Sequence, residues 1–139
     1  MKRVMLSLLL VALLVGCNSN KTTAQHQTIE ASEVIEKVTN QETFVLLITN
    51  DDCDPCTEFH EKTSNKLSEI NKDLYELNYS SVDANTSDQL NQVLSDYSSW
   101  PVLMYIQNGK LYENGVYEYS LDPEGWEEWL IEQNLLPQN

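Results

Sequence analysis

The sequence predicts an α/β fold, in which a central mixed β-sheet is flanked by helices on both faces. Two continuous apolar runs, 44–48 and 102–106, are typical of strands that are buried on both faces. Around these runs, apolar residues recur at the three- and four-residue spacing of amphipathic helices. Asn108-Gly109, shortly after the second run, is a strong hairpin signal, so a further strand is expected to return beside that run.

These signals give the element order βαβαβαββα. Alternating apolar residues indicate strands, while Ser32 and Asp122-Pro123 are typical of helix starts. The expected strands cover 28–30, 42–49, 75–83, 102–106 and 110–119. The expected helices cover 32–38, 55–72, 86–97 and a last segment that begins at 122.

The composition fits one acidic domain. The chain has 139 residues, enough for a single core, and 8 Lys and Arg stand against 22 Asp and Glu, for a net charge of −14. A chain of this charge is repelled by nucleic acid and by anionic lipid headgroups, so we expect no nucleic-acid partner.

The N-terminus has the pattern of an export signal. A basic start, Met1-Lys2-Arg3, precedes the almost wholly apolar stretch 4–15. As a helix, that stretch would be about 18 Å long, short of the roughly 30 Å hydrocarbon core of a membrane. Gly16-Cys17 at its end resembles a bacterial lipobox, which implies cleavage before Cys17 and lipid attachment to its sulfur. The alternative is an ordinary secretory leader with an incidental cysteine.

This pattern divides the chain into three parts. Residues 1–16 are expected to be a lipoprotein signal peptide, 17–27 a lipidated cysteine and flexible polar tether, and 28–139 the folded domain. His26 falls in the expected tether, as a solvated residue. The predicted location is extracytoplasmic, with the protein anchored to the cell membrane through Cys17.

The most informative stretch is 50–56, which ends in Cys53-Asp54-Pro55-Cys56. It follows an apolar strand and precedes a helical segment, so Cys53 is expected at a helix start. Unpaired N–H groups and the helix dipole favour an anion there, and the thiolate is the reactive form of cysteine. Pro55 is tolerated in a first helical turn. These features predict a dithiol–disulfide exchange site; the alternatives are a structural disulfide or a zinc half-site, for which no second cysteine pair exists.

Cys53-Asp54-Pro55-Cys56 after one apolar strand, and Trp100-Pro101 before another, resemble the thioredoxin superfamily over roughly residues 28–136. The resemblance implies a thioredoxin-like fold in which Cys53 exchanges with substrate and Cys56 resolves the mixed disulfide. It also implies that Pro101 is cis and lies beside the cysteines, while Trp100 offers backbone groups to an extended substrate. The alternative is a trans proline at the start of an edge strand.

Two departures from that family concern reactivity. Asp52 stands where many members have a tryptophan, and Trp100 is bulkier than the residue usual before this proline. Asp51, Asp52, Asp54 and Glu58 crowd the cysteines, and their charges disfavour the Cys53 thiolate against the helix dipole. Less stabilisation of the thiolate makes the dithiol a better reductant. We therefore expect a reductant rather than an oxidant, with Asp52, Asp54, Pro55 and Glu58 as tuning residues. The alternative is that the Asp side chains face water and that their charges are screened.

A further departure concerns the resolving cysteine. Thioredoxins often bury an acid on the central strand beneath the cysteines, and by spacing that place falls near Leu47. Leucine accepts no proton, so either Glu58 or water is expected to help deprotonate Cys56, or resolution of the mixed disulfide is slow.

The predicted function is extracytoplasmic thiol–disulfide exchange on cysteine-containing exported proteins or peptides, with a membrane redox partner. The chain also resembles thioredoxin-like accessory proteins associated with bacteriocin export. No bound cofactor is expected, because the cysteine pair itself cycles between dithiol and disulfide. Two alternatives remain: a copper chaperone that uses Cys53, Cys56 and His60, and a non-catalytic interaction lipoprotein whose disulfide is structural.

Overall fold

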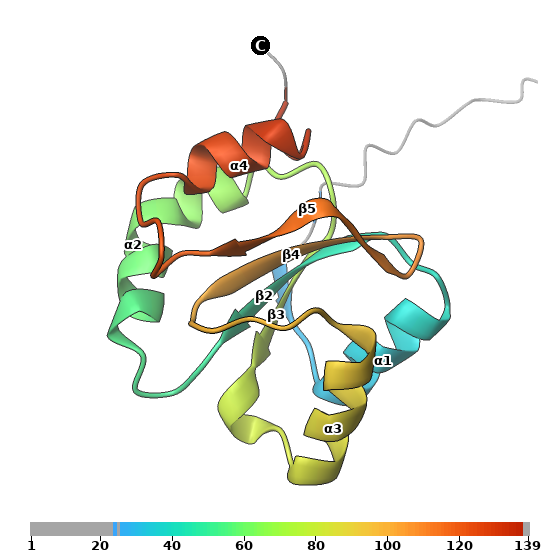
Figure 1. Cartoon of the computed structure of the whole chain (residues 1–139). Helices are drawn as coiled ribbons and strands as arrows, with labels where there is room; N and C mark the ends of the chain where they lie inside the picture. Colours follow the sequence, from blue (N-terminus) through green and yellow to red (C-terminus); the bar gives the residue numbers. More distant parts are fainter. Residues whose placement is uncertain (1–23, 25, 138–139) are drawn as a thin grey trace, which may run out of the picture.

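The computed structural model describes residues 24 and 26–137, which form one five-stranded mixed sheet with helices on both faces (Figure 1). The strand order is β1-β3-β2-β4-β5, with β1 and β3 parallel to β2 and with β4 antiparallel to both β2 and β5. The strands are β1 (His26–Thr28), β2 (Phe44–Thr49), β3 (Leu74–Asn78), β4 (Val102–Gln107) and β5 (Lys110–Glu118). The predicted fold class is therefore confirmed.

Helices α1 (Ala31–Thr39) and α3 (Ala84–Val93) cover one face of the sheet, and α2 (Asp54–Leu67) and α4 (Trp126–Glu132) cover the other (Figure 1). A short 3-10 turn, η1 (Tyr79–Ser81), follows β3. Each face has its own apolar core. Phe59, Trp129 and Leu130 pack on the α2–α4 side, while Val34 and Leu90 pack on the α1–α3 side.

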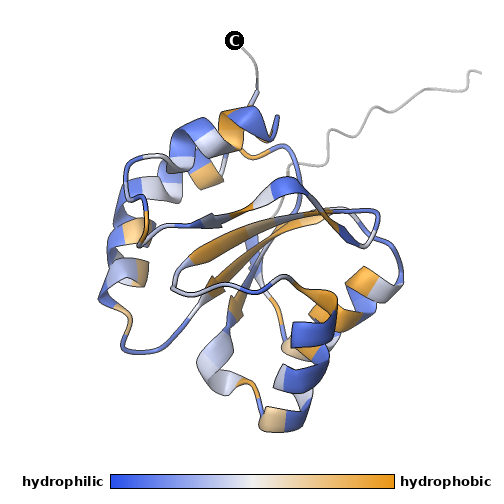
Figure 2. Ribbon diagram, viewed as in Figure 1, coloured by the Kyte–Doolittle hydropathy of each residue, from blue (hydrophilic) through white to orange (hydrophobic). Residues whose placement is uncertain are grey.

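The central strand β2 is buried along its whole length, and it appears with β4 as the hydrophobic centre of Figure 2. Its side chains alternate between the two cores, with Leu47 toward α2 and α4 and with Leu46 and Ile48 toward α1 and α3. Burial of a leucine or isoleucine side chain contributes about 1.5–3 kcal/mol, so this strand is a rigid base for whatever follows its end.

The predicted hairpin at Asn108-Gly109 is confirmed. Both residues have positive φ, 52° and 70°, as tight two-residue hairpin turns require. Only glycine fits the second position, because a Cβ at Gly109 would come within 2.2 Å of the carbonyl oxygen of Val38.

Several expected boundaries are wrong by a few residues. Helix α1 begins earlier, because Glu30 and Glu33 form a reciprocal capping box and Ser32 is not the cap. Helix α2 ends at Leu67 and not near Lys72, because the chain must turn before it enters β3.

Helix α3 begins earlier than expected, where Asp83 caps the N–H groups of Asn85 and Thr86, and it ends at Val93. Helix α4 begins after a turn in which Asp122 accepts a hydrogen bond from the N–H of Gly125. Strand β1 begins at His26, so this residue belongs to the sheet and not to the tether, although its side chain is exposed as expected.

The expected signal peptide, Cys17 and nearly all of the expected tether lie outside the described residues. Within residues 24 and 26–137, no helix is long and apolar enough to cross a membrane.

Candidate active site

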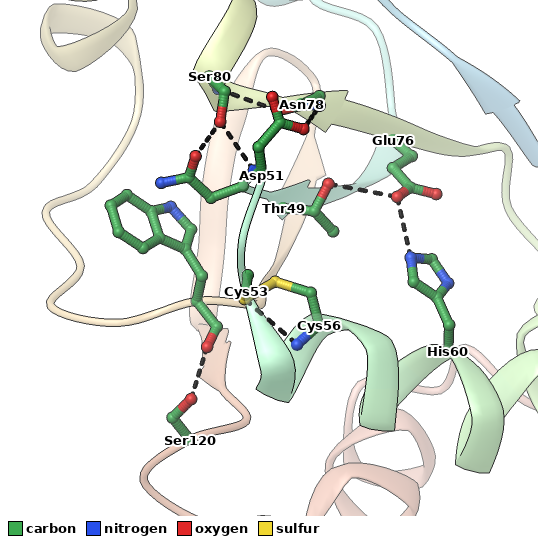
Figure 3. The surroundings of a disulfide bond; sticks show 11 residues. Thr49, Asp51, Cys53, Cys56, His60, Glu76, Asn78, Ser80 and Ser120 are labelled. Carbon is green, nitrogen blue, oxygen red and sulfur yellow. Dashed lines mark hydrogen bonds and ion pairs between the residues drawn. A yellow bond between two sulfur atoms is a disulfide. The ribbon is translucent and has the colours of Figure 1, made fainter.

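The cysteine pair lies where β2 passes into α2, as the sequence predicts (Figure 3). Cys53 is the N-cap of α2, and its sulfur accepts a hydrogen bond from the N–H of Cys56 at 3.2 Å. The two sulfurs form a disulfide, with the Cα atoms 5.2 Å apart. Cys56 is only 5% exposed and Cys53 is half-buried, so Cys53 carries the more accessible sulfur. Pro55 lies in the first turn, where its missing N–H has no helical partner.

The loop between β2 and Cys53 is fastened to the segment at the end of β3 (Figure 3). The N–H of Asp51 donates to Ser80 Oγ at 2.7 Å, and Asn78 Nδ2 donates to Asp51 Oδ1 at 2.8 Å. Ser80 Oγ also donates to Asn50 Oδ1. Asp52 has φ 53°, in the left-handed region that Asp tolerates better than most residues. Sequence reasoning missed this fastening, because no local pattern marks Asn78 and Ser80 as partners of the loop.

The Trp100–Pro101 peptide bond is cis, which confirms the expectation drawn from the family resemblance. Ile48 pairs with Val102 in the sheet, so Pro101 lies at the same end of the sheet as the loop that carries Cys53. The carbonyl oxygen of Trp100 accepts a hydrogen bond from Ser120 Oγ at 2.5 Å, so this acceptor is already engaged within the chain.

The Trp100 side chain belongs to a group of three aromatic rings. Its ring centre lies 6.3 Å from that of Tyr79 and 6.4 Å from that of Tyr97. Burial among these rings raises the pKa of Tyr97 to about 12. The contacts hold the indole in place at the edge of the cysteine site.

An open hollow of about 390 Å³ surrounds Cys53. It brings together two regions that are far apart in the sequence, the 50–55 loop and the residues before Pro101. Its lining residues are Asn50, Asp51, Asp52, Cys53, Asp54, Pro55, Ser99 and Trp100. Three of the four expected acidic neighbours of the cysteines therefore share this hollow with Cys53.

The fourth acidic residue, Glu58, is held elsewhere. Its Oε1 atom lies 2.9 Å from Lys62 Nζ and accepts a hydrogen bond from the Tyr119 hydroxyl at 3.1 Å. The hydrogen bonds from Lys62 and then Tyr119 lower the pKa of Glu58. Glu58 is thus occupied as an ion-pair partner, which weakens its expected role as proton acceptor for Cys56.

A carboxylate that the sequence analysis missed lies on the neighbouring strand. Glu76 of β3 pairs in register with Leu47, the residue near which thioredoxins often have their buried acid. Its Oε1 atom lies 3.0 Å from His60 Nε2 and 3.3 Å from Thr49 Oγ1 (Figure 3), and its Oε2 atom lies 3.0 Å from His26 Nε2. The only signal for this site was that Glu76 is a charged residue within a strand.

The two histidines decide the ionisation of Glu76. Burial by itself raises the pKa of this carboxyl, whose side chain is 22% exposed. The hydrogen bonds and charges of His26 and His60 outweigh that effect, so the pKa of Glu76 is lowered. The carboxylate form is therefore the one that the fold stabilises.

This arrangement also bears on the copper alternative. His60 hydrogen-bonds Glu76 on β3, so it is not directed at the cysteine pair as the proposed Cys53, Cys56 and His60 set requires (Figure 3). Across the described part of the chain, no three His, Cys, Asp or Glu side chains are grouped as metal ligands would be. The geometry does not support that alternative.

The lowered pKa of Glu76 predicts that the variant Glu76→Gln loses stability in a pH-dependent way. A lowered pKa stabilises the fold above the ordinary glutamate value of 4.5, and this contribution disappears as pH falls through the lower folded value. At pH 6 we expect the free energy of unfolding to fall by about 1–3 kcal/mol, as for a hydrogen bond to a charged group. Urea unfolding at pH 6 and pH 3 measures the difference, which should shrink at pH 3. Glu36→Gln, at an exposed position on α1, is the control, and an equal loss at both pH values would contradict the prediction.

Comparison with known proteins supports the fold. Neither a family model nor a curated protein matches the sequence. Among solved structures, Chlamydomonas reinhardtii thioredoxin f2 matches with a TM-score of 0.59 at 14% identity, covering 82% of this chain and 100% of that one. Oxidised thioredoxin O1 from Arabidopsis thaliana matches with a TM-score of 0.57 at 13% identity, over 81% and 98% of the two chains. A Halobacterium salinarum thioredoxin mutant gives 0.56 at 14% identity, over 83% and 95%. The chain therefore has the thioredoxin fold.

Proposed function

We propose that the protein is a thiol–disulfide oxidoreductase whose reactive pair is Cys53 and Cys56. The observation that carries this proposal is the disulfide at the start of α2, with one half-exposed and one buried sulfur. A helix N-terminus at an accessible sulfur favours the thiolate that exchange requires.

In the reducing direction, the Cys53 thiolate attacks one sulfur of a substrate disulfide. The substrate S–S bond breaks, one substrate thiolate leaves, and a mixed disulfide joins Cys53 to the substrate. The Cys56 thiolate then attacks the Cys53 sulfur and releases the second substrate thiolate. The substrate gains two electrons and the protein regains its disulfide.

The acidic surroundings support a reductant. Asp51, Asp52 and Asp54 are exposed and line the same hollow as Cys53. Their negative charges disfavour the Cys53 thiolate. They therefore destabilise the reduced, dithiol form of the protein relative to its disulfide form.

The location and partners follow from the N-terminal pattern. We place the protein outside the cytoplasm, attached to the membrane by lipid on Cys17, where exported proteins or peptides with cysteines would be its substrates. A membrane redox partner would restore its dithiol. The resemblance to accessory proteins of bacteriocin export supports peptides as substrates.

Cys56→Ser tests the exchange mechanism. Without the resolving thiol, the mixed disulfide on Cys53 should accumulate and be seen as a covalent adduct by non-reducing gel and mass spectrometry. Cys53→Ser is the matched control and should form no such adduct, because Cys56 is buried. Equal adduct formation by both variants, or by neither, would rule out the assigned roles.

The reduction potential tests the direction of exchange. We expect a value closer to the roughly −270 mV of thioredoxin than to the roughly −120 mV of strong oxidants. Asp52→Asn should raise the potential by about 10–20 mV, because loss of a nearby surface charge stabilises the thiolate. Equilibration with glutathione or dithiothreitol buffers measures both values. A wild-type potential near −120 mV would refute the reductant assignment.

Cys17→Ala tests the anchor. In a bacterial host that lipidates such signals, the wild-type protein should fractionate with membranes and incorporate labelled fatty acid, and Cys17→Ala should do neither. Ser19→Ala, two positions away, is the control and should behave as wild type. Membrane fractionation of Cys17→Ala without label would show that lipid is not what holds the protein there.

A further inference from the structure

The hollow around Cys53 has two chemically different sides. Asp51, Asp52 and Asp54 line it together with Cys53 and supply carboxylates, and Trp100, distant in the sequence, supplies an aromatic side chain. A substrate that reacts at Cys53 must bring the residues next to its cysteine into this space.

The three carboxylates come from the loop before α2 and from the first residue of that helix. Asp51 is fastened through its backbone to Ser80 and through its side chain to Asn78. Asp52 has a left-handed backbone next to Cys53, and Asp54 is the first residue of α2. Asp54 also complements the helix dipole at the helix start, whereas Asp51 and Asp52 precede the helix.

Within the part of the chain that the structure describes, no lysine, arginine or histidine forms an ion pair with Asp51, Asp52 or Asp54. The lysines that do form ion pairs have other partners: Lys37 with Glu42, Lys62 with Glu58 and Glu124, and Lys66 with Glu69 and Glu127. The negative charge beside Cys53 is therefore open to a partner from outside.

We propose that this site selects substrates in which Lys or Arg flanks the reacting cysteine. The proposal rests on the function proposed above and names its substrate class. A lysine or arginine side chain complements the carboxylates with its charge, and it can lie over the Trp100 ring with its head group or its alkyl stem. Acidic flanking residues are repelled by the same carboxylates. Asp52 and Asp54 are thus specificity residues for the exchange at Cys53.

The test uses the full-length protein, reduced beforehand and freed of reductant, as the electron donor. Three synthetic disulfide peptides are the electron acceptors. Each peptide has the same intramolecular disulfide loop, flanked by Lys, Gln or Glu. The protein dithiol is converted to the disulfide as the peptide disulfide becomes a dithiol, and acid quenching with alkylation and mass spectrometry gives the rate constant. Dithiothreitol, an uncharged dithiol, gives the intrinsic reactivity of each peptide, and each protein rate is divided by it.

After this correction, the Lys peptide should react roughly tenfold faster than the Glu peptide at low ionic strength, with the Gln peptide between them. The ratio should fall toward one in high salt, which screens charges beyond a few ångströms. It should also fall in the double variant Asp52→Asn, Asp54→Asn, in which asparagine tolerates the left-handed backbone at position 52. Use of a ratio removes any change in the intrinsic reactivity of Cys53.

The matched control is Glu36→Gln, Glu113→Gln, which removes the same amount of charge from exposed positions that do not line the hollow. This control should keep the wild-type ratio. If all peptides react but the corrected ratio is one, or if the two double variants change it equally, the inference is overturned while the proposed function stands. If no peptide reacts, the proposed function fails and the inference fails with it.

Discussion

The site depends on the passage from β2 to α2. All residues of β2 are buried, so the end of this strand is fixed by packing on both faces of the sheet. Helix α2 begins a short loop later. Cys53 is its N-cap residue, and the Cys53 sulfur accepts a hydrogen bond from the N–H of Cys56. The rigid strand thus sets the position of the N-terminus of α2. The free N–H groups and the dipole at that N-terminus in turn act on the accessible sulfur of Cys53.

Glu76 extends this constraint to other parts of the chain. A half-buried carboxylate is costly unless it is paired, and this one is paired with histidines from two different elements. His26 lies on the edge strand β1 and His60 on α2, so one side chain of β3 links both to the middle of the sheet. The acid that the central strand lacks at Leu47 is therefore present on the neighbouring strand in the same register.

The sequence was sufficient for the features that have local signals. The apolar runs predicted β2 and β4, Asn108-Gly109 predicted the hairpin, and the Cys53–Cys56 spacing predicted the helix start. The predicted helix boundaries were less accurate, because neighbouring residues compete as caps. At the start of α1, for example, the Glu30–Glu33 capping box is used and Ser32 is not. The Glu76 cluster and the fastening of Asp51 could not be predicted, because both depend on the register between strands that are distant in the sequence.

The direction of β1 has a consequence for how the domain is presented. β1 runs parallel to β3, and β3 runs parallel to β2, whose far end leads to Cys53. The chain therefore enters the sheet from the end opposite to the cysteines. The point at which the domain joins whatever precedes His26 and the disulfide are therefore at opposite ends of the sheet, so an attachment at the former does not cover the latter.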